Sequence, residues 1–198
     1  AEAHRQVGLY RIPIPPIIFV EHEEWKPGIL GLIAGSLSEH YYRPVVAVSL
    51  NGGVCRASAR SVPEFDIAEA LRECGELFRR FGGHPRAAGF TASTQDLPRV
   101  KQALTSSAQE QLAGIDMTPA LDIDCEISPA LLDDRNFAFI RSLGPFGEGN
   151  PEPVFLTQGA RVREVRKVGD PPDHLKMRIG HDGRSWGAIA FKQGDRAA

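Results

Sequence analysis

Apolar and polar positions in the first 113 residues follow two repeats, one typical of strands and one typical of helices. The apolar run at 17–20 and the β-branched run at 44–50 predict buried strands, and the segment 27–42 between them predicts a helix with Pro27 at its first position. Residues 54–61 and 87–93 are expected to be further strands, and residues 96–113 a weaker helix. Helices and strands that alternate in this way predict an α/β unit with a mixed sheet.

A further helix is predicted from Asp66, because Asp66 followed by Glu69 is typical of a capping box at a helix start. Its apolar positions keep to one helical face as far as Phe81, at residues 67, 70, 71, 74, 77, 78 and 81. Gly82 then stands where a helix commonly stops. The pattern therefore predicts a helix from about 66 to 81.

The helical pattern ends near 114–119, which divides the chain into predicted domains 1–115 and 120–198. In the second domain we expect a strand at 120–127, a helix at 129–143 and an irregular segment at 144–155, followed by strands near 161–168, 174–179 and 185–191. Short strands separated by turn residues predict a small barrel or sandwich. Because so few strands rarely close a barrel, we expect this domain to be incomplete.

Composition limits the classes of function. The chain of 198 residues is 42% hydrophobic and 24% charged, which is typical of a globular protein and excludes general disorder. Its net charge of −2 predicts no global attraction to nucleic acid, so any such binding requires a local basic patch. The apolar run at 12–20 is too short and too rich in proline to cross a membrane, and no signal pattern begins the sequence, so we expect a cytoplasmic location, for a whole protein or a piece of one.

The cysteines and acidic residues predict no metal centre. Cys55, Cys74 and Cys125 are odd in number and form no CxxC pair, so we expect reduced, mostly buried thiols. An acidic group at positions 21, 23 and 24 is typical of a solvated loop.

Three glycines, Gly28, Gly31 and Gly35, share one face of the first predicted helix. Their spacing is not that of a dinucleotide-binding loop, and a smooth helix face packed closely on a sheet is the favoured interpretation.

Two segments of the first domain have the chemistry of a phosphate site. Ser58 and Arg60 are two apart on a predicted strand, so both side chains share a face, where a hydroxyl and a guanidinium can bind a phosphate. Further donors follow: the backbone N–H groups of Gly82 and Gly83, the ring of His84 and the guanidinium of Arg86. The simpler alternative is that Gly82 only ends a helix and Arg60 is only a surface cation.

The second domain has two predicted strands with basic alternate positions. Arg161 and Arg163 flank a valine, and Lys176 and Arg178 alternate with apolar residues. Such strands could follow a nucleic-acid backbone while Trp186 or Phe191 stacks on bases. Half-exposed strands are also commonly basic for solubility, and nearby aspartates dilute the patch, so both interpretations remain open.

Several segments follow one another in a distinctive order over about residues 20 to 194: WKPGILGLIAGSLSEHYYRP, ASARS, FDIAEALRECGELFRRFGGHPRAAGF, LGPFGEGNPEPVF, KVGDPPDHLKMRI and AIAFKQGD. This succession resembles the RecJ family of single-strand-specific DNA exonucleases. The GGH and PFGEGNPEPVF segments are quite specific.

This resemblance implies an α/β DHH-associated domain followed by the first part of an OB-type domain, from an enzyme of the DHH phosphoesterase superfamily that acts in DNA repair and recombination. The Mn²⁺ or Mg²⁺ ions of such enzymes belong to an N-terminal catalytic domain that this chain lacks, so the chain itself is expected to bind no metal and to be inactive alone. The resemblance assigns Ser58, Arg60, Gly82, Gly83 and His84 to the 5′ end and its phosphate, with His84 positioning substrate and not activating water. The OB-type domain is expected to hold the single-stranded DNA.

Two positions depart from the family pattern. Lys26 stands where members usually have a histidine, and Ser36 where an arginine is usual nearby. Two other functions remain open. One is an oligoribonuclease or cyclic-dinucleotide phosphodiesterase of the same superfamily, and the other is a noncatalytic single-strand-binding module.

Overall fold

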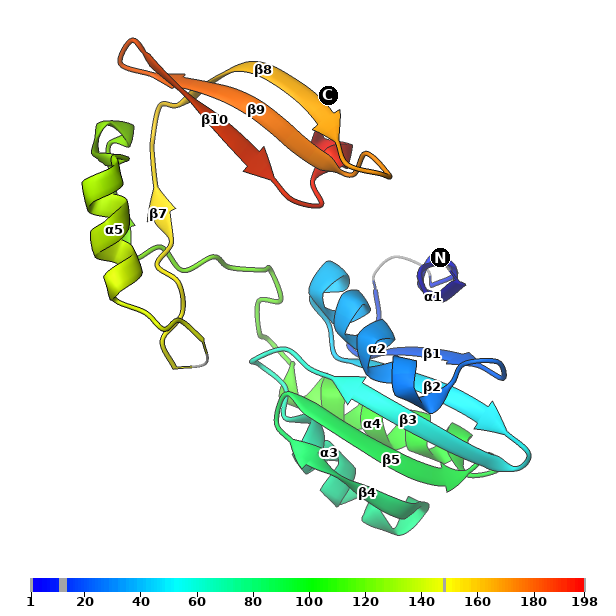
Figure 1. Ribbon diagram of the computed structural model, residues 1–198. Coiled ribbons are helices and arrows are strands. Elements are labelled where there is room, and N and C mark those ends of the chain that lie inside the picture. The colour runs from blue at the N-terminus through cyan, green and yellow to red at the C-terminus, as the bar shows by residue number, and fades with distance from the viewer. Residues whose placement is uncertain (1, 11–13, 148, 198) are drawn as a thin grey trace. The chain divides into compact units, whose positions relative to one another are not determined.

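The computed structural model describes residues 2–10, 14–147 and 149–197 (Figure 1). The chain forms two compact units, Ala1–Pro119 and Ala120–Ala198. None of the described helices is long and apolar enough to cross a membrane.

The first unit contains one mixed five-stranded sheet. Its strands are β1 (Ile18–His22), β2 (Val45–Asn51), β3 (Val54–Arg60), β4 (Phe78–His84) and β5 (Ala87–Ser93). The spatial order is β1-β2-β3-β5-β4, with β1 parallel to β2 and every other pair antiparallel. The predicted α/β fold with a mixed sheet is confirmed. The β2–β3 hairpin turns through Gly52 and Gly53, which both have positive φ, as a tight two-residue turn of this kind requires.

Helices cover both faces of this sheet. Helix α2 (Pro27–Tyr41) packs on one face, where Leu30 and Leu37 are buried with Ile18 and Val45. Helices α3 (Ile67–Glu73) and α4 (Leu97–Gln111) lie on the other face (Figure 1). Residues of β2, β3 and β5 meet these two helices in a larger core. The alternation of buried side chains along the strands produces these two cores.

A short helix that the sequence pattern did not predict, α1 (Glu2–Val7), lies beside β1. The Gln6 side-chain amide donates to the Glu21 carbonyl at 2.9 Å, and its carbonyl accepts from the Glu21 N–H at 3.0 Å. The Tyr10 hydroxyl makes similar contacts with the backbone of Phe19. Side chains thus satisfy the outer edge of β1, which would otherwise be open to another strand.

The prediction of one helix from 66 to 81 is wrong. Helix α3 ends at Glu73, a short 3₁₀ helix (Gly75–Leu77) follows, and the rest is strand β4. The pairing of β4 with β5 shifts by one residue between Phe78 and Arg80, which is a β-bulge. Phe78 and Phe81 therefore share one face of a strand despite their separation of three, and Phe78 lies beside both Phe81 and Phe90. A bulged strand and a helix give the same spacing here, so Gly82 ends no helix.

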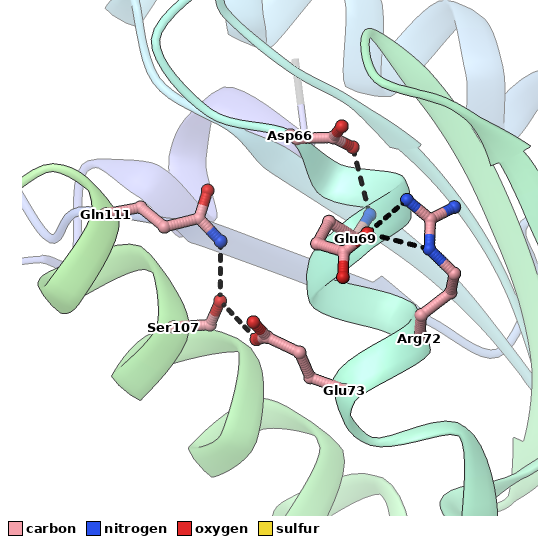
Figure 2. Close-up of polar contacts among 6 residues, drawn as sticks. All are labelled: Asp66, Glu69, Arg72, Glu73, Ser107 and Gln111. Carbon is pink, nitrogen blue, oxygen red and sulfur yellow. Dashed lines mark hydrogen bonds and ion pairs between the residues drawn. The ribbon is translucent and has the colours of Figure 1, made fainter.

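Helix α3 begins as predicted at Asp66, although only half of the capping box forms. The Asp66 carboxylate accepts from the Glu69 N–H at 2.9 Å (Figure 2), while the Glu69 side chain binds Arg72 and does not return to the cap. Glu73 accepts a hydrogen bond of 2.9 Å from Ser107 of α4. This contact links the two helices at the surface.

The second unit contains less regular structure than predicted before residue 160. The expected strand at 120–127 is reduced to β6 (Cys125–Glu126), which pairs with β7 (Phe155–Leu156). The expected helix at 129–143 is a 3₁₀ helix (Pro129–Leu131) followed by α5 (Asp134–Ser142). The last three predicted strands are confirmed as an antiparallel sheet of β8 (Arg161–Val168), β9 (His174–His181) and β10 (Arg184–Ala190), and a 3₁₀ helix (Gly194–Arg196) follows. Within the described residues these sheets do not close into a barrel.

The three thiols should differ in reactivity. Cys55 and Cys74 are buried and Cys125 is exposed. Burial raises the pKa of the Cys55 thiol and raises that of Cys74 to about 11. Since the thiolate is the reactive form, we expect an aromatic disulfide reagent at pH 8 to label Cys125 rapidly and the other two only after unfolding. Stopped-flow absorbance checks this, and Cys125→Ser should remove the fast phase. A single rate for all three thiols would contradict the packing of Cys55 and Cys74.

Candidate functional site

The sheet register brings the predicted phosphate residues together across three strands. Arg60 of β3 pairs with Ala87 of β5, which pairs with His84 of β4. In the next row on the same face, Ser58 pairs with Gly89, which pairs with Gly82. Because paired residues point to the same face of a sheet, the side chains of Arg60 and His84 lie on one face, on either side of β5.

Small residues form the floor between these two strands. On this face β5 presents Ala87, Gly89 and Thr91, whereas its larger Phe90 is buried on the opposite face. A side chain added at Gly89 would meet the Ala57 carbonyl at 3.0 Å. The result is a hollow of about 730 Å³ above Gly89 and Thr91, between β3, β4 and the start of α2. It is open enough to receive a group with the size of a phosphate or nucleotide.

The Arg60 side chain lies under α2. Its guanidinium donates to the Ala59 carbonyl at 2.9 Å and to the Ser58 hydroxyl at 3.3 Å. A Cβ on Gly31 would lie 3.0 Å from an Arg60 nitrogen and 3.4 Å from the Ser58 hydroxyl. Glycine at position 31 therefore makes room for the Arg60–Ser58 pair.

The other two glycines of that helix face have a different setting. A Cβ on Gly28 or Gly35 would meet nothing within 4 Å. Both line a small hollow beside Arg60, together with Ser36 and Glu39. The expectation of a smooth helix face packed closely on the sheet is wrong for these two positions. Ser36, one of the two departures from the family pattern, thus shares a hollow with Arg60, while Lys26 is exposed just before α2.

The tip of the β4–β5 hairpin is anchored to the end of β3. The Ser61 N–H donates to the Arg86 carbonyl at 3.0 Å, and the Arg86 side chain donates back to the Ser61 carbonyl at 3.0 Å. The Ile67 N–H donates to the Pro85 carbonyl at 3.2 Å. These bonds fix His84 relative to Arg60, and they give Arg86 a structural contact besides the phosphate role predicted for it.

Gly82 and Gly83 have different reasons to be glycine. Gly83 has a φ of +151°, and a Cβ there would lie 2.4 Å from the Ala87 carbonyl and from the Ala88 Cα. The backbone therefore requires glycine at Gly83. At Gly82, φ is ordinary and a Cβ would meet nothing within 4 Å. Because both residues lie in a strand, their N–H groups point along the plane of the sheet and not into the hollow. Gly82 therefore contributes to the hollow only by having no side chain to fill it.

Sequence reasoning missed three arginines of this surface. Arg56 of β3 and Arg80 of β4 both pair with Thr91, one row beyond Ser58 and Gly82. Arg79, the extra residue of the bulge, lines the same hollow. The sequence pattern predicts a helix over 66–81, so it gives no signal that Arg79 and Arg80 share a sheet face with Arg56.

In the second unit the register confirms a basic and an apolar face. Arg161, Arg166, Lys176 and Arg178 share one face of the β8–β10 sheet, and a side chain added at Gly180 would meet Arg163 there at 2.4 Å. The opposite face carries rows of apolar residues: Val162, Ile179 and Trp186, then Val165, Met177 and Ala188. Trp186 therefore lies on the apolar face, opposite the basic residues. Phe191 is 66% exposed, beyond the end of β10.

No three His, Cys, Asp or Glu side chains in the described part of the chain gather to hold a metal ion. The described His, Cys, Asp and Glu side chains therefore do not fit the divalent metal that the resemblance implies.

Comparisons with known proteins agree with this architecture. The DHHA1 domain model matches residues 15–110, and the RecJ OB domain model matches residues 123–198. The single-stranded-DNA-specific exonuclease RecJ of Bacillus subtilis is 32% identical over 90% of this chain, and that of Thermus thermophilus is 35% identical over 88%. This chain spans only 23% and 24% of the length of those two proteins.

A solved structure shows the same arrangement of elements. The crystal structure of Thermus thermophilus RecJ in complex with Mn²⁺ matches this chain with a TM-score of 0.74 and 29% sequence identity. The match covers 99% of this chain and 28% of the Thermus chain. The matches extend over both units and include the OB domain that bears the RecJ name. The chain therefore belongs to the RecJ family, of which it contains the DHHA1 domain and the RecJ OB domain.

Proposed function

We propose that this chain is the substrate-binding part of a single-stranded-DNA-specific exonuclease that degrades DNA from the 5′ end. The observation that carries the proposal is the row in which Arg60 and His84 face each other across Ala87, beside the row of Ser58, Gly89 and Gly82. A terminal phosphate above Ala87 and Gly89, at the edge of the hollow, would lie between a guanidinium and a hydroxyl of β3 and an imidazole of β4. Charge-assisted hydrogen bonds of this kind are the strong ones in phosphate recognition.

The names of the relatives support single-stranded DNA as the substrate, since the curated proteins that match are single-stranded-DNA-specific exonucleases. The crystallised relative from Thermus was solved with Mn²⁺ and also with Mg²⁺. We therefore assign the metal ions, and the activation of water, to a catalytic DHH domain outside this chain. The chain alone would bind and position DNA without cleaving it.

The basic face of the β8–β10 sheet would bind the strand further along. Arg161, Arg163 and Lys176 on this face can neutralise backbone phosphates without reading bases. An oligoribonuclease or cyclic-dinucleotide phosphodiesterase is less well supported, because residues 123–198 match a domain described for RecJ. A noncatalytic single-strand-binding module would bind DNA with and without a 5′ phosphate equally, which the first experiment below measures.

Replacing Arg60 should remove the preference for a 5′ phosphate. We expect Arg60→Gln to weaken binding of 5′-phosphorylated oligothymidylate by about 1.5 to 3 kcal/mol, or tenfold to a hundredfold, and to leave 5′-hydroxyl oligothymidylate nearly unaffected. Fluorescence anisotropy at fixed salt measures both affinities. Arg99→Gln on α4 removes an equal charge from the other side of the sheet and is the matched control. An unchanged preference in Arg60→Gln would exclude Arg60 from the site.

Substitutions at Gly82 and Gly83 should affect different properties, DNA binding at Gly82 and the free energy of unfolding at Gly83. Gly82→Ala should change the free energy of unfolding by less than about 1 kcal/mol, because its backbone is ordinary, yet weaken binding by occupying the hollow. Gly83→Ala should lower the free energy of unfolding by about 1 to 3 kcal/mol. Urea denaturation and anisotropy on the same samples test both. Normal 5′-phosphate binding by a stable Gly82→Ala protein would show that the ligand does not approach this strand.

Reversing charge on the basic face should reduce the salt dependence of binding to long strands. Arg163→Glu should weaken binding and reduce the slope of log K against log salt by about 0.7 for each lost phosphate contact. Lys167→Glu makes the same change of charge on the opposite face, since Lys167 pairs with the buried Leu175. Equal slopes for the two variants would mean that the basic face does not bind the strand.

A further inference from the structure

We propose that Arg56, Arg79 and Arg80 form a second phosphate subsite, which binds an internal phosphate of the strand whose 5′ end lies at Ser58, Arg60 and His84. The inference rests on the proposed function and extends it to residues that neither the sequence pattern nor the resemblance assigned. It concerns how many nucleotides of the substrate this one sheet holds.

The β-bulge in β4 creates this cluster. In a regular strand Arg79 and Arg80 would point to opposite faces. Here Phe78 and Phe81 both turn to the face that carries Phe90, as their ring contacts show. The two residues between them lie on the other face, and both line the hollow with Ser58 and Gly82. One extra residue thus directs two neighbouring guanidinium groups to the same side.

The three arginines have no partners of their own. Across the described residues none of their guanidinium groups takes part in an ion pair or a side-chain hydrogen bond, although Arg5, Arg72 and Arg99 each pair with a carboxylate. The residues that line the hollow include no aspartate or glutamate. Like charges gathered in this way repel one another, and a bound anion would relieve that repulsion.

The spacing fits two phosphates of one strand. Arg56 and Arg80 both pair with Thr91, and Ser58 and Gly82 both pair with Gly89. The Arg56–Arg80 row lies two residues, or about 7 Å, from the Ser58–Gly82 row and four residues, or about 13 Å, from the Arg60–His84 row. These distances are comparable to one and two phosphate spacings of an extended single strand. Because Gly89 and Thr91 form a low floor between the rows, the backbone can pass from one to the other.

Surface arginines on an edge strand are also common for solubility alone. That explanation accounts for the exposure of Arg79 and Arg80, but it requires neither their alignment by a bulge nor the presence of Arg56 in the same hollow. The two explanations differ in whether a particular phosphate is recognised, which neutral linkages can test.

The experiment uses the full chain and 5′-phosphorylated oligothymidylates with one uncharged methylphosphonate at the first, second or third linkage. We expect one of these substitutions to weaken binding by about tenfold, since it removes a charge-assisted contact. Arg80→Gln should bind the unmodified strand correspondingly less well and lose sensitivity to that linkage, while it keeps the preference for a 5′ phosphate over a 5′ hydroxyl. Arg56→Gln should behave in the same way, and Arg99→Gln should behave as the parent.

Any of three results would overturn the second subsite. One is equal binding of all three modified strands by the parent protein, and another is an Arg80→Gln protein that keeps the parent's sensitivity at every linkage. A gain in affinity for a 5′-triphosphate that depends on Arg80, without any linkage effect, would also overturn it, since the arginines would then bind terminal phosphates. The same titrations compare the parent's affinities for 5′-phosphorylated and 5′-hydroxyl strands. Equal affinities there would refute the proposed 5′-end site itself, independently of the second subsite.

Discussion

The pairing of β4 with β5 is the constraint on which the candidate site depends. β4 is an edge strand, held on one side by this pairing and at its end by the bonds from Ser61 and Ile67 to the hairpin tip. Phe78 packs against the core and Phe81 lies beside it on the same face, which leaves Gly82 and His84 to the opposite face. Because β5 presents only small residues on that face, β3 and β4 can act on one ligand across it.

Two β-bulges, one in β4 and one in β8, determine where charged side chains lie on the two sheets. The bulge in β4 directs Arg79 and Arg80 to one face, and a second register shift in β8, after Val162, brings Glu164 opposite Arg178. In the first case the bulge concentrates positive charge, and in the second it places a carboxylate 3.9 Å from a guanidinium. A β-bulge thus increases the positive charge of the hollow in the first unit and reduces that of the basic face in the second.

Net charge is a poor guide to this protein. The chain carries a formal charge of −2, yet the hollow of the first unit and one face of the β8–β10 sheet are both basic. Several acidic side chains are engaged elsewhere, such as Glu69 with Arg72 and Glu21 with Lys101. Separation of charge of this kind allows local attraction of a polyanion without global attraction.

The sequence by itself determined the elements whose pattern is local. Four strands of the first sheet and helices α2 and α4 follow from residue periodicity, and a spacing of two places Ser58 and Arg60 on one face. Only the tertiary structure decided that β4 is a strand, since Phe78 and Phe81 fit a helix and a bulged strand equally well. It also decided that Gly31 leaves space for Arg60 and that Arg56 and Arg80 both pair with Thr91. These relations depend on strand register and helix packing between distant segments, and periodicity along one segment carries no information about either.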